Sequence, residues 1–130
     1  MQVPYPLYGA VLLFYINGAS LQSTSDQVFT RVFPATKYVI SDIRAVGATG
    51  GVTVACAGGI YNEASKGGDE LVAATQDWTG ITAVDKVMQP SLESVVGTDV
   101  QTETPILSLT TGSTAAATAN IYIYGYSMDV

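Results

Sequence analysis

Hydrophobic and polar residues alternate over short segments of this chain, and no run of a dozen residues repeats its apolar positions with a helical period. The segments are rich in Val, Ile, Thr, Tyr and Phe, which favour β-strands, and clusters of Gly, Ser, Asp and Pro separate them. This pattern predicts an all-β protein. The expected strands are residues 10–16, 27–33, 38–46, 52–57, 70–75, 83–88, 106–110 and 119–126.

About eight short strands with this spacing are typical of an antiparallel two-sheet β-sandwich, and in particular of a jelly roll. In the segment 52–57, Val52, Val54 and Cys56 fall on one face, as in a strand that packs on one side only. The length of 130 residues suits one compact domain. We therefore expect a single β-sandwich domain over residues 1–130.

Glycines mark the expected turns, because glycine adopts a positive φ at no steric cost. They occur in 47–51, at Gly58-Gly59 and at Gly67-Gly68, and the Ala/Thr-rich tract 111–118 is expected to form a further loop. The GATGG and ACAGG segments lack the Lys-Ser/Thr pair and the helix that a phosphate-binding loop requires. We interpret both as turns.

The first and last expected strands are apolar on both faces. In 10–16, one face carries Leu12 and Phe14 and the other carries Tyr15. In 119–126, isoleucines line one face and a stripe of tyrosines lines the other: Tyr122, Tyr124 and Tyr126. A single sandwich hides only one face of each sheet. The tyrosines therefore form an exposed cross-strand aromatic ladder, lie beneath loops of the same chain, or contact another subunit.

Residues 1–9 precede the first strand and contain Pro4 and Pro6, which cannot donate hydrogen bonds to a sheet. The same segment carries Tyr5 and Tyr8. One interpretation is an extended N-terminal arm that reaches over a neighbouring subunit, and the other is a disordered tail.

Trp78, the only tryptophan, falls between two expected strands. Its side chain either plugs the core at one end of the sandwich or anchors an interface. The candidate interface residues from the sequence are Tyr5, Tyr8, Leu12, Phe14, Trp78, Tyr122, Tyr124 and Tyr126.

Charged residues make up only 12% of the chain, against roughly 25% in ordinary soluble domains. A surface with so little charge is typical of a protein that partners cover. The net charge is −6 with five cations, so we expect no nucleic-acid binding. Asp42 and Arg44, two apart on one strand face, are interpreted as a solvated pair.

The apolar stretch 9–16 is too short to span a bilayer, follows two prolines and has no basic region before it. We expect neither a signal peptide nor a membrane anchor, and therefore synthesis in the cytoplasm.

The sequence contains no histidine, which excludes Ser-His-Asp and Cys-His catalytic arrangements. Cys56 is the only cysteine, so no intramolecular disulfide or cysteine-based zinc site can form, and we expect it to be buried. Adjacent Asp69 and Glu70 point to opposite faces of a strand, which weakens them as a catalytic carboxylate pair. We therefore expect no enzyme, no cofactor and no metal. The loop aspartates, which form no calcium-binding run, are Asp26, Asp69, Asp77, Asp85 and Asp99.

Two stretches carry a resemblance to a known group of proteins: GGVTVACAGGIYNEASKGGDELVAATQDWTGIT and LSLTTGSTAAATANIYIYGY. They resemble small virion structural proteins of tailed phages and prophages. Together with the strand count, the chain is similar to the jelly-roll cement or decoration proteins that sit on assembled capsids. The resemblance covers about residues 23–130 and includes no catalytic motif.

The resemblance implies a capsid cement or decoration protein on the virion surface, in a homo-oligomer (dimer or trimer) that binds the major capsid protein. One alternative is a carbohydrate-binding module of a tail fibre or spike, in which exposed Tyr side chains and Trp78 stack on sugar rings. Another is a tail-tube, connector or adaptor subunit, which would form rings through heterologous contacts.

Overall fold

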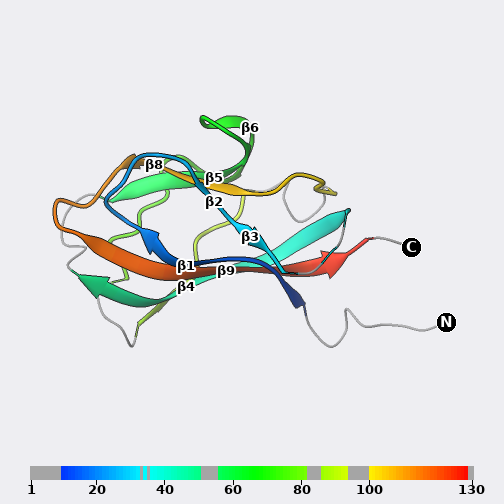
Figure 1. The fold of residues 1–130 in the computed structure, drawn as a ribbon, viewed down its shortest axis with the longest axis horizontal. Helices are drawn as coiled ribbons and strands as arrows, with labels where there is room; N and C mark the ends of the chain where they lie inside the picture. Colours follow the sequence, from blue (N-terminus) through cyan, green and yellow to red (C-terminus); the bar gives the residue numbers. More distant parts are fainter. Residues whose placement is uncertain are drawn as a thin grey trace.

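The computed structural model describes residues 10–32, 34, 36–50, 56–81, 86–93 and 100–128. Within these ranges the chain forms nine β-strands and no helix, so the all-β prediction is confirmed. All strand pairs are antiparallel, and the two sheets lie one above the other as two layers (Figure 1).

The five-stranded sheet has the order β3-β1-β9-β4-β7, and the four-stranded sheet has the order β2-β8-β5-β6. The strands of the larger sheet are β1 (Val11–Ser20), β3 (Thr30–Arg31), β4 (Tyr38–Gly50), β7 (Val87–Met88) and β9 (Ala117–Ser127). The strands of the smaller sheet are β2 (Gln27–Val28), β5 (Ala57–Glu63), β6 (Gly67–Val72) and β8 (Ile106–Thr111).

Most expected strands correspond to observed ones, with shifted ends. The segments 10–16, 38–46, 106–110 and 119–126 lie in β1, β4, β8 and β9. The segment 27–33 is divided between β2 and β3, which belong to different sheets. Residues 52–55 and 83–85 of two further expected strands lie outside the described residues.

The core lies between the layers, where the inward faces of both sheets meet. Its largest fully buried side chains include Trp78, Phe14 and Tyr38. The indole N–H of Trp78 donates to the carbonyl oxygen of Gly58 at 3.0 Å, and the Phe14 and Tyr38 rings pack edge to face at 5.1 Å. Trp78 is therefore a core plug that fastens its loop to β5.

Strict alternation predicts that Phe14 shares a face with Leu12. The two side chains lie on opposite faces instead. A register shift between Leu12 and Phe14 in the β1–β9 pairing adds one residue to β1. Such a bulge rotates the strand locally. Leu13 and Phe14 are consequently both buried at 1% exposure, while Leu12 remains half-buried on the other face.

Gly58 and Gly59 do not form the expected turn but lie inside β5. A Cβ atom on Gly58 would lie 2.3 Å from the Leu109 Cα, and one on Gly59 would lie 2.4 Å from the Val72 carbonyl oxygen. These glycines are required because neighbouring backbone approaches too closely for any side chain.

The turn between β5 and β6 is made by Ser65 and Lys66, one step before the expected Gly67-Gly68 turn. Both residues have positive φ, 59° and 58°, and the Gly67 N–H donates to the Ala64 carbonyl oxygen at 3.1 Å. Positive φ is unfavourable for residues with a Cβ atom. The turn therefore needs support from outside the hairpin.

That support is a polar cluster that joins three segments. Asp26 accepts hydrogen bonds from the Ser65 backbone N–H at 2.7 Å and from the Ser108 hydroxyl at 2.8 Å, and the Lys66 ammonium donates to Ser108 Oγ at 2.9 Å. The hydrogen bond from Ser65, then that from Ser108, hold the pKa of the Asp26 carboxyl below its usual range.

Replacing Gly58 by Ala should destabilise the protein by about 3 kcal/mol, because the added methyl group meets β8 backbone that cannot move aside. Gly80→Ala is the matched control: nothing lies within 4 Å of its Cβ position, and its stability should change by less than about 0.5 kcal/mol. Urea unfolding followed by Trp78 fluorescence measures both. Equal stability of the two variants would contradict this account of β5.

Replacing Asp26 by Asn should lower stability at neutral pH and reduce the loss of stability in acid. The folded-state pKa of Asp26 lies below its ordinary value of about 3.9, so its contribution is present above that pH and is lost as pH falls through the folded-state pKa. The urea midpoints of wild type and variant should converge as the pH falls through the folded-state pKa. Asp69→Asn is the control, since the Asp69 carboxylate makes no hydrogen bond within the described residues. A constant gap between wild type and Asp26→Asn at all pH values would refute the assignment.

Candidate functional site

The outer side of the larger sheet carries the tyrosines that the sequence singled out. On β9, Ile121 and Ile123 are fully buried, while Tyr122, Tyr124 and Tyr126 on the opposite side are half-buried. Neighbouring strands extend this surface, because residues directly opposite one another in antiparallel strands share a face. We call it the tyrosine face, formed by Leu12, Tyr15, Val39, Asp42, Arg44, Val46, Tyr122, Tyr124 and Tyr126.

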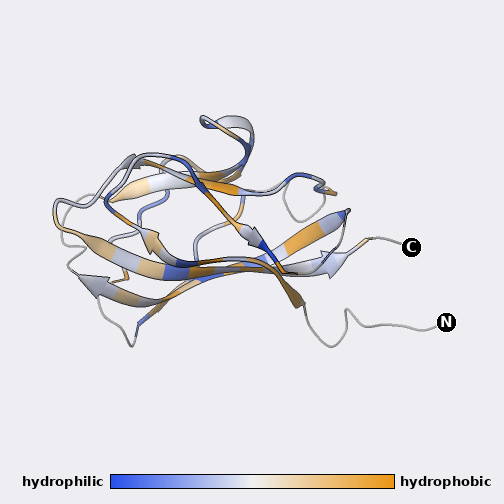
Figure 2. Ribbon diagram, viewed as in Figure 1, coloured by the Kyte–Doolittle hydropathy of each residue, from blue (hydrophilic) through white to orange (hydrophobic). Residues whose placement is uncertain are grey.

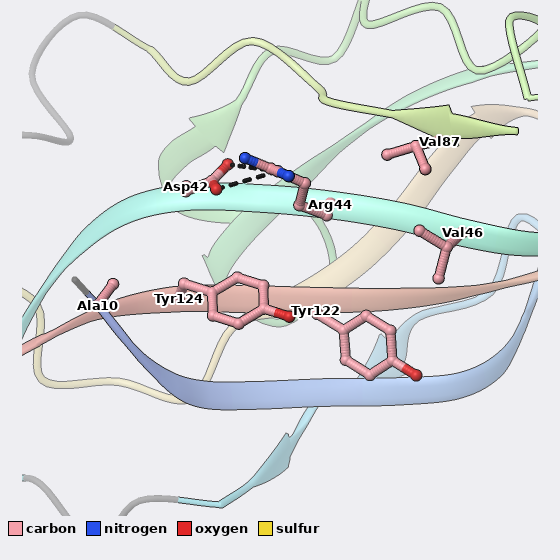
Figure 3. A pocket seen from close by; sticks show the side chains of 7 residues that line it. All are labelled: Ala10, Asp42, Arg44, Val46, Val87, Tyr122 and Tyr124. Carbon is pink, nitrogen blue, oxygen red and sulfur yellow. Dashed lines mark hydrogen bonds and ion pairs between the residues drawn. The ribbon is translucent and has the colours of Figure 1, made fainter. Parts of the chain in front are cut away.

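An open hollow of about 430 Å³ lies in the tyrosine face. Its residues come from the start of β1 and from β4, β7 and β9, and they are Ala10, Asp42, Arg44, Val46, Val87, Tyr122 and Tyr124. Figure 3 shows the Tyr122 and Tyr124 rings side by side along β9, with their broad faces turned toward the viewer. The hollow is therefore lined by two aromatic rings, with aliphatic and charged side chains beside them.

The charged side chains of the hollow are held in place by one another. Arg44 Nε lies 3.1 Å from Asp42 Oδ2, and the Gln89 side-chain amide donates to Asp42 Oδ1 at 2.9 Å. The Arg44 side chain is 49% exposed and that of Asp42 is 23% exposed. The pair is thus partly shielded and oriented, and it also borders the hollow.

The structure divides the candidate interface residues into three groups. Phe14 and Trp78 are buried at 1% and 0% exposure, so their side chains are enclosed by the chain itself. Tyr5 and Tyr8 lie outside the described residues. The tyrosine face carries the remaining ones, Leu12, Tyr122, Tyr124 and Tyr126.

Sequence reasoning missed Val87, which lines the hollow, and Gln89, which donates a hydrogen bond to Asp42. Val87 is 62% exposed on β7, and Gln89 follows that strand. Pairing of Val87 with Val46 brings this segment to β4. The sequence contained no signal for this contact, because the pairing of Val46 with Val87 depends on the order of strands in the sheet. Of the polar residues that line the hollow, the sequence revealed only the pair Asp42 and Arg44, through their two-residue spacing.

A second surface feature is a group of exposed hydrophobic side chains at the end of the sandwich from which both termini leave (Figure 1). Backbone contacts place them there: Val32 N donates to Leu13 O, Met128 N donates to Lys37 O, and Gln101 N donates to Tyr38 O. Figure 2 shows that the start of β1 at this end is strongly hydrophobic. We call this group the terminal cluster, and its members are Val11 (41% exposed), Val32 (47%), Val100 (50%) and Met128 (44%).

The Asp26, Lys66 and Ser108 side chains form the described contact that most resembles a nucleophile beside a base. Ser108 is fully buried, its hydroxyl donates to Asp26, and it accepts from the Lys66 ammonium. Because Ser108 is fully buried, a substrate cannot reach its hydroxyl. We therefore assign the cluster to support of the β5–β6 turn.

Other candidate chemical groups also have local roles. Burial raises the pKa of the Cys56 thiol, which is fully enclosed. Hydrogen bonds from the Thr79 hydroxyl and N–H lower the pKa of Asp77. Among the described residues no three His, Cys, Asp or Glu side chains are grouped to hold a metal ion, and Asp85 and Asp99 lie outside those residues. Within the same ranges there is no helix of the length and apolarity needed to cross a membrane.

Comparison with known proteins gives no relative for this chain. No protein-family model matches it, no curated protein matches it, and no solved structure matches its fold.

Proposed function

We propose that this chain is a structural subunit of a tailed-phage virion, and specifically a jelly-roll cement or decoration protein that binds and stabilises the assembled capsid lattice. In this proposal the subunit is a homo-oligomer (dimer or trimer), its partner is the major capsid protein, and it resides on the capsid surface of the virion. It performs no catalysis.

The order of strands supports the jelly-roll part of the proposal. If β2 and β3 are counted as one bent strand, the chain has eight strands, and the first is hydrogen-bonded to the eighth (β1 with β9). The second pairs with the seventh (β2 with β8), the third with the sixth (β4 with β7), and the fourth with the fifth (β5 with β6). A long antiparallel hairpin rolled into two sheets has this nested pairing, which is that of a jelly roll.

The terminal cluster is the observation that carries the functional proposal. Four large apolar side chains, each between 41% and 50% exposed, belong to segments that meet at one end of the sandwich. Grouped exposed hydrophobic side chains mark protein contacts more often than single ones. In this proposal residues 1–9, which carry Tyr5 and Tyr8 and precede Ala10 in the sequence, form an arm that extends the contact.

Low charge supports the same role. Only 12% of the residues are charged, so burying large parts of the surface removes few ions from water. A protein that binds only the assembled lattice stabilises that lattice by mass action, without any chemistry of its own. Of the surfaces described above, the terminal cluster is the one that we assign to such contacts.

Replacing Val11 by Asp should convert the oligomer into monomer, because a carboxylate in the terminal cluster would be desolvated without a partner. Val28→Asp is the matched control, since Val28 is 62% exposed on β2 and is not part of the cluster. Light scattering coupled to size exclusion measures the mass of each. A wild-type chain that is already monomeric, or equal effects of the two substitutions, would remove the terminal cluster from the interface.

The virion role predicts that an epitope-tagged chain, produced during phage growth in cells that carry its gene, bands with purified particles in a density gradient. Immunogold electron microscopy should place the tag on heads, and Val11→Asp should reduce its occupancy more than Val28→Asp does. Label on tails would favour a tail or connector subunit. Absence of the chain from particles would refute the virion assignment.

A further inference from the structure

We propose that the hollow beside Tyr122 and Tyr124 is a binding site for a neutral carbohydrate. This inference is independent of the terminal cluster and of oligomer formation. It replaces the idea that Trp78 stacks on sugar, because that indole is fully buried and donates to the Gly58 carbonyl oxygen.

The aromatic side chains provide the first part of the argument. Tyr122 and Tyr124 are two residues apart on β9, so their attachment points are separated by roughly 7 Å along the strand. Their rings lie broadside on the sheet instead of standing upright (Figure 3). The electron-rich face of an aromatic ring attracts the weakly positive C–H groups on the apolar face of a pyranose. The hollow thus offers two stacking surfaces in a row.

The polar side chains provide the second part. The Asp42 carboxylate and the Arg44 guanidinium hold one another at 3.1 Å and line the hollow together with the two rings. No hydrogen bond within the described residues uses the hydroxyl groups of Tyr122 and Tyr124. Donors and acceptors that are fixed side by side match adjacent hydroxyl groups of a sugar, each of which both donates and accepts.

The dimensions allow more than one sugar unit. A second hollow of about 380 Å³ shares Asp42 with the first and is otherwise lined by Ile43, Gln89, Pro90, Ser91 and Leu92. Both hollows are open to solvent, and small-molecule sites commonly measure roughly 300–1,000 Å³. An open site of this kind fits a segment of an oligosaccharide better than an enclosed small molecule.

Charge selects the class of carbohydrate. The charges of Asp42 and Arg44 cancel one another within the hollow, and the whole chain has a net charge of −6. A negative protein repels acidic polysaccharides at long range, and a neutral hollow has no surplus cation to bind them. The ligand we infer is therefore a neutral oligosaccharide.

The test begins with the full chain on an array of neutral and acidic glycans, followed by titration of the best neutral glycan by NMR. Binding should weaken by about tenfold in Tyr122→Ala and in Arg44→Ala, since a lost stacking or hydrogen-bonding partner is worth about 1.4 kcal/mol. Tyr122→Leu repeats the test with the buried volume largely kept, in case the alanine variant does not fold. Trp78 fluorescence reports folding in each case.

Tyr126→Ala is the matched control, because Tyr126 is half-buried on the same face of the same strand and does not line the hollow. Its affinity should stay within about twofold of wild type. Equal weakening in Tyr126→Ala, preference for acidic glycans, or no binding to any neutral glycan would overturn the proposal.

Two other occupants give different results in the same experiment. If the hollow receives residues 1–9 of this chain, a synthetic peptide of that sequence shifts the NMR signals of Tyr122 and the glycans do not. If it receives a second copy, Arg44→Ala lowers the oligomer mass. Either result would overturn the carbohydrate site. Neither bears on Val11→Asp, which tests the terminal cluster separately.

Discussion

Strand β9 (Ala117–Ser127) lies between β1 and β4, and most of the larger sheet depends on this central position. Side chains of a strand alternate between its two faces, so the placement of Ile121 and Ile123 in the core fixes Tyr122 and Tyr124 on the outside. A slip of one residue would exchange the isoleucines for tyrosines. The burial that stabilises the fold therefore also places the aromatic rings of the candidate site.

Close approach of backbones is a second constraint, and it acts within the smaller sheet. The glycines at 58 and 59 let β8 and the segment after β6 come within contact distance of β5. The same approach leaves the Gly58 carbonyl oxygen within reach of the Trp78 indole. A buried N–H without an acceptor is costly, so this hydrogen bond helps to set where the tryptophan loop packs.

The two surface features suit different kinds of contact. The terminal cluster consists of exposed apolar side chains, which fits a contact between proteins. The hollow combines aromatic rings with the oriented Asp42–Arg44 pair, which fits a hydroxylated ligand. A protein that attaches to a particle at one end and presents a sheet face to solvent can serve both purposes. The nested strand pairing makes this possible because it brings the start of β1 and the end of β9 to the same end of the sandwich.

Sequence alone determined the fold class and the composition of the tyrosine stripe, because a period of two between Ile121 and Tyr126 is a local property of the chain. It also determined the absence of histidine chemistry and the weak charge. It misplaced Phe14, because a bulge depends on the partner strand and leaves no local mark. The predicted turn at Gly58 and Gly59 was wrong for a related reason. In the sequence, a glycine that lets two backbones approach closely cannot be told from a glycine that forms a turn. Only the tertiary structure completed the hollow: Val87 lines it, and Gln89 reaches Asp42, because sheet order brings together strands far apart in sequence.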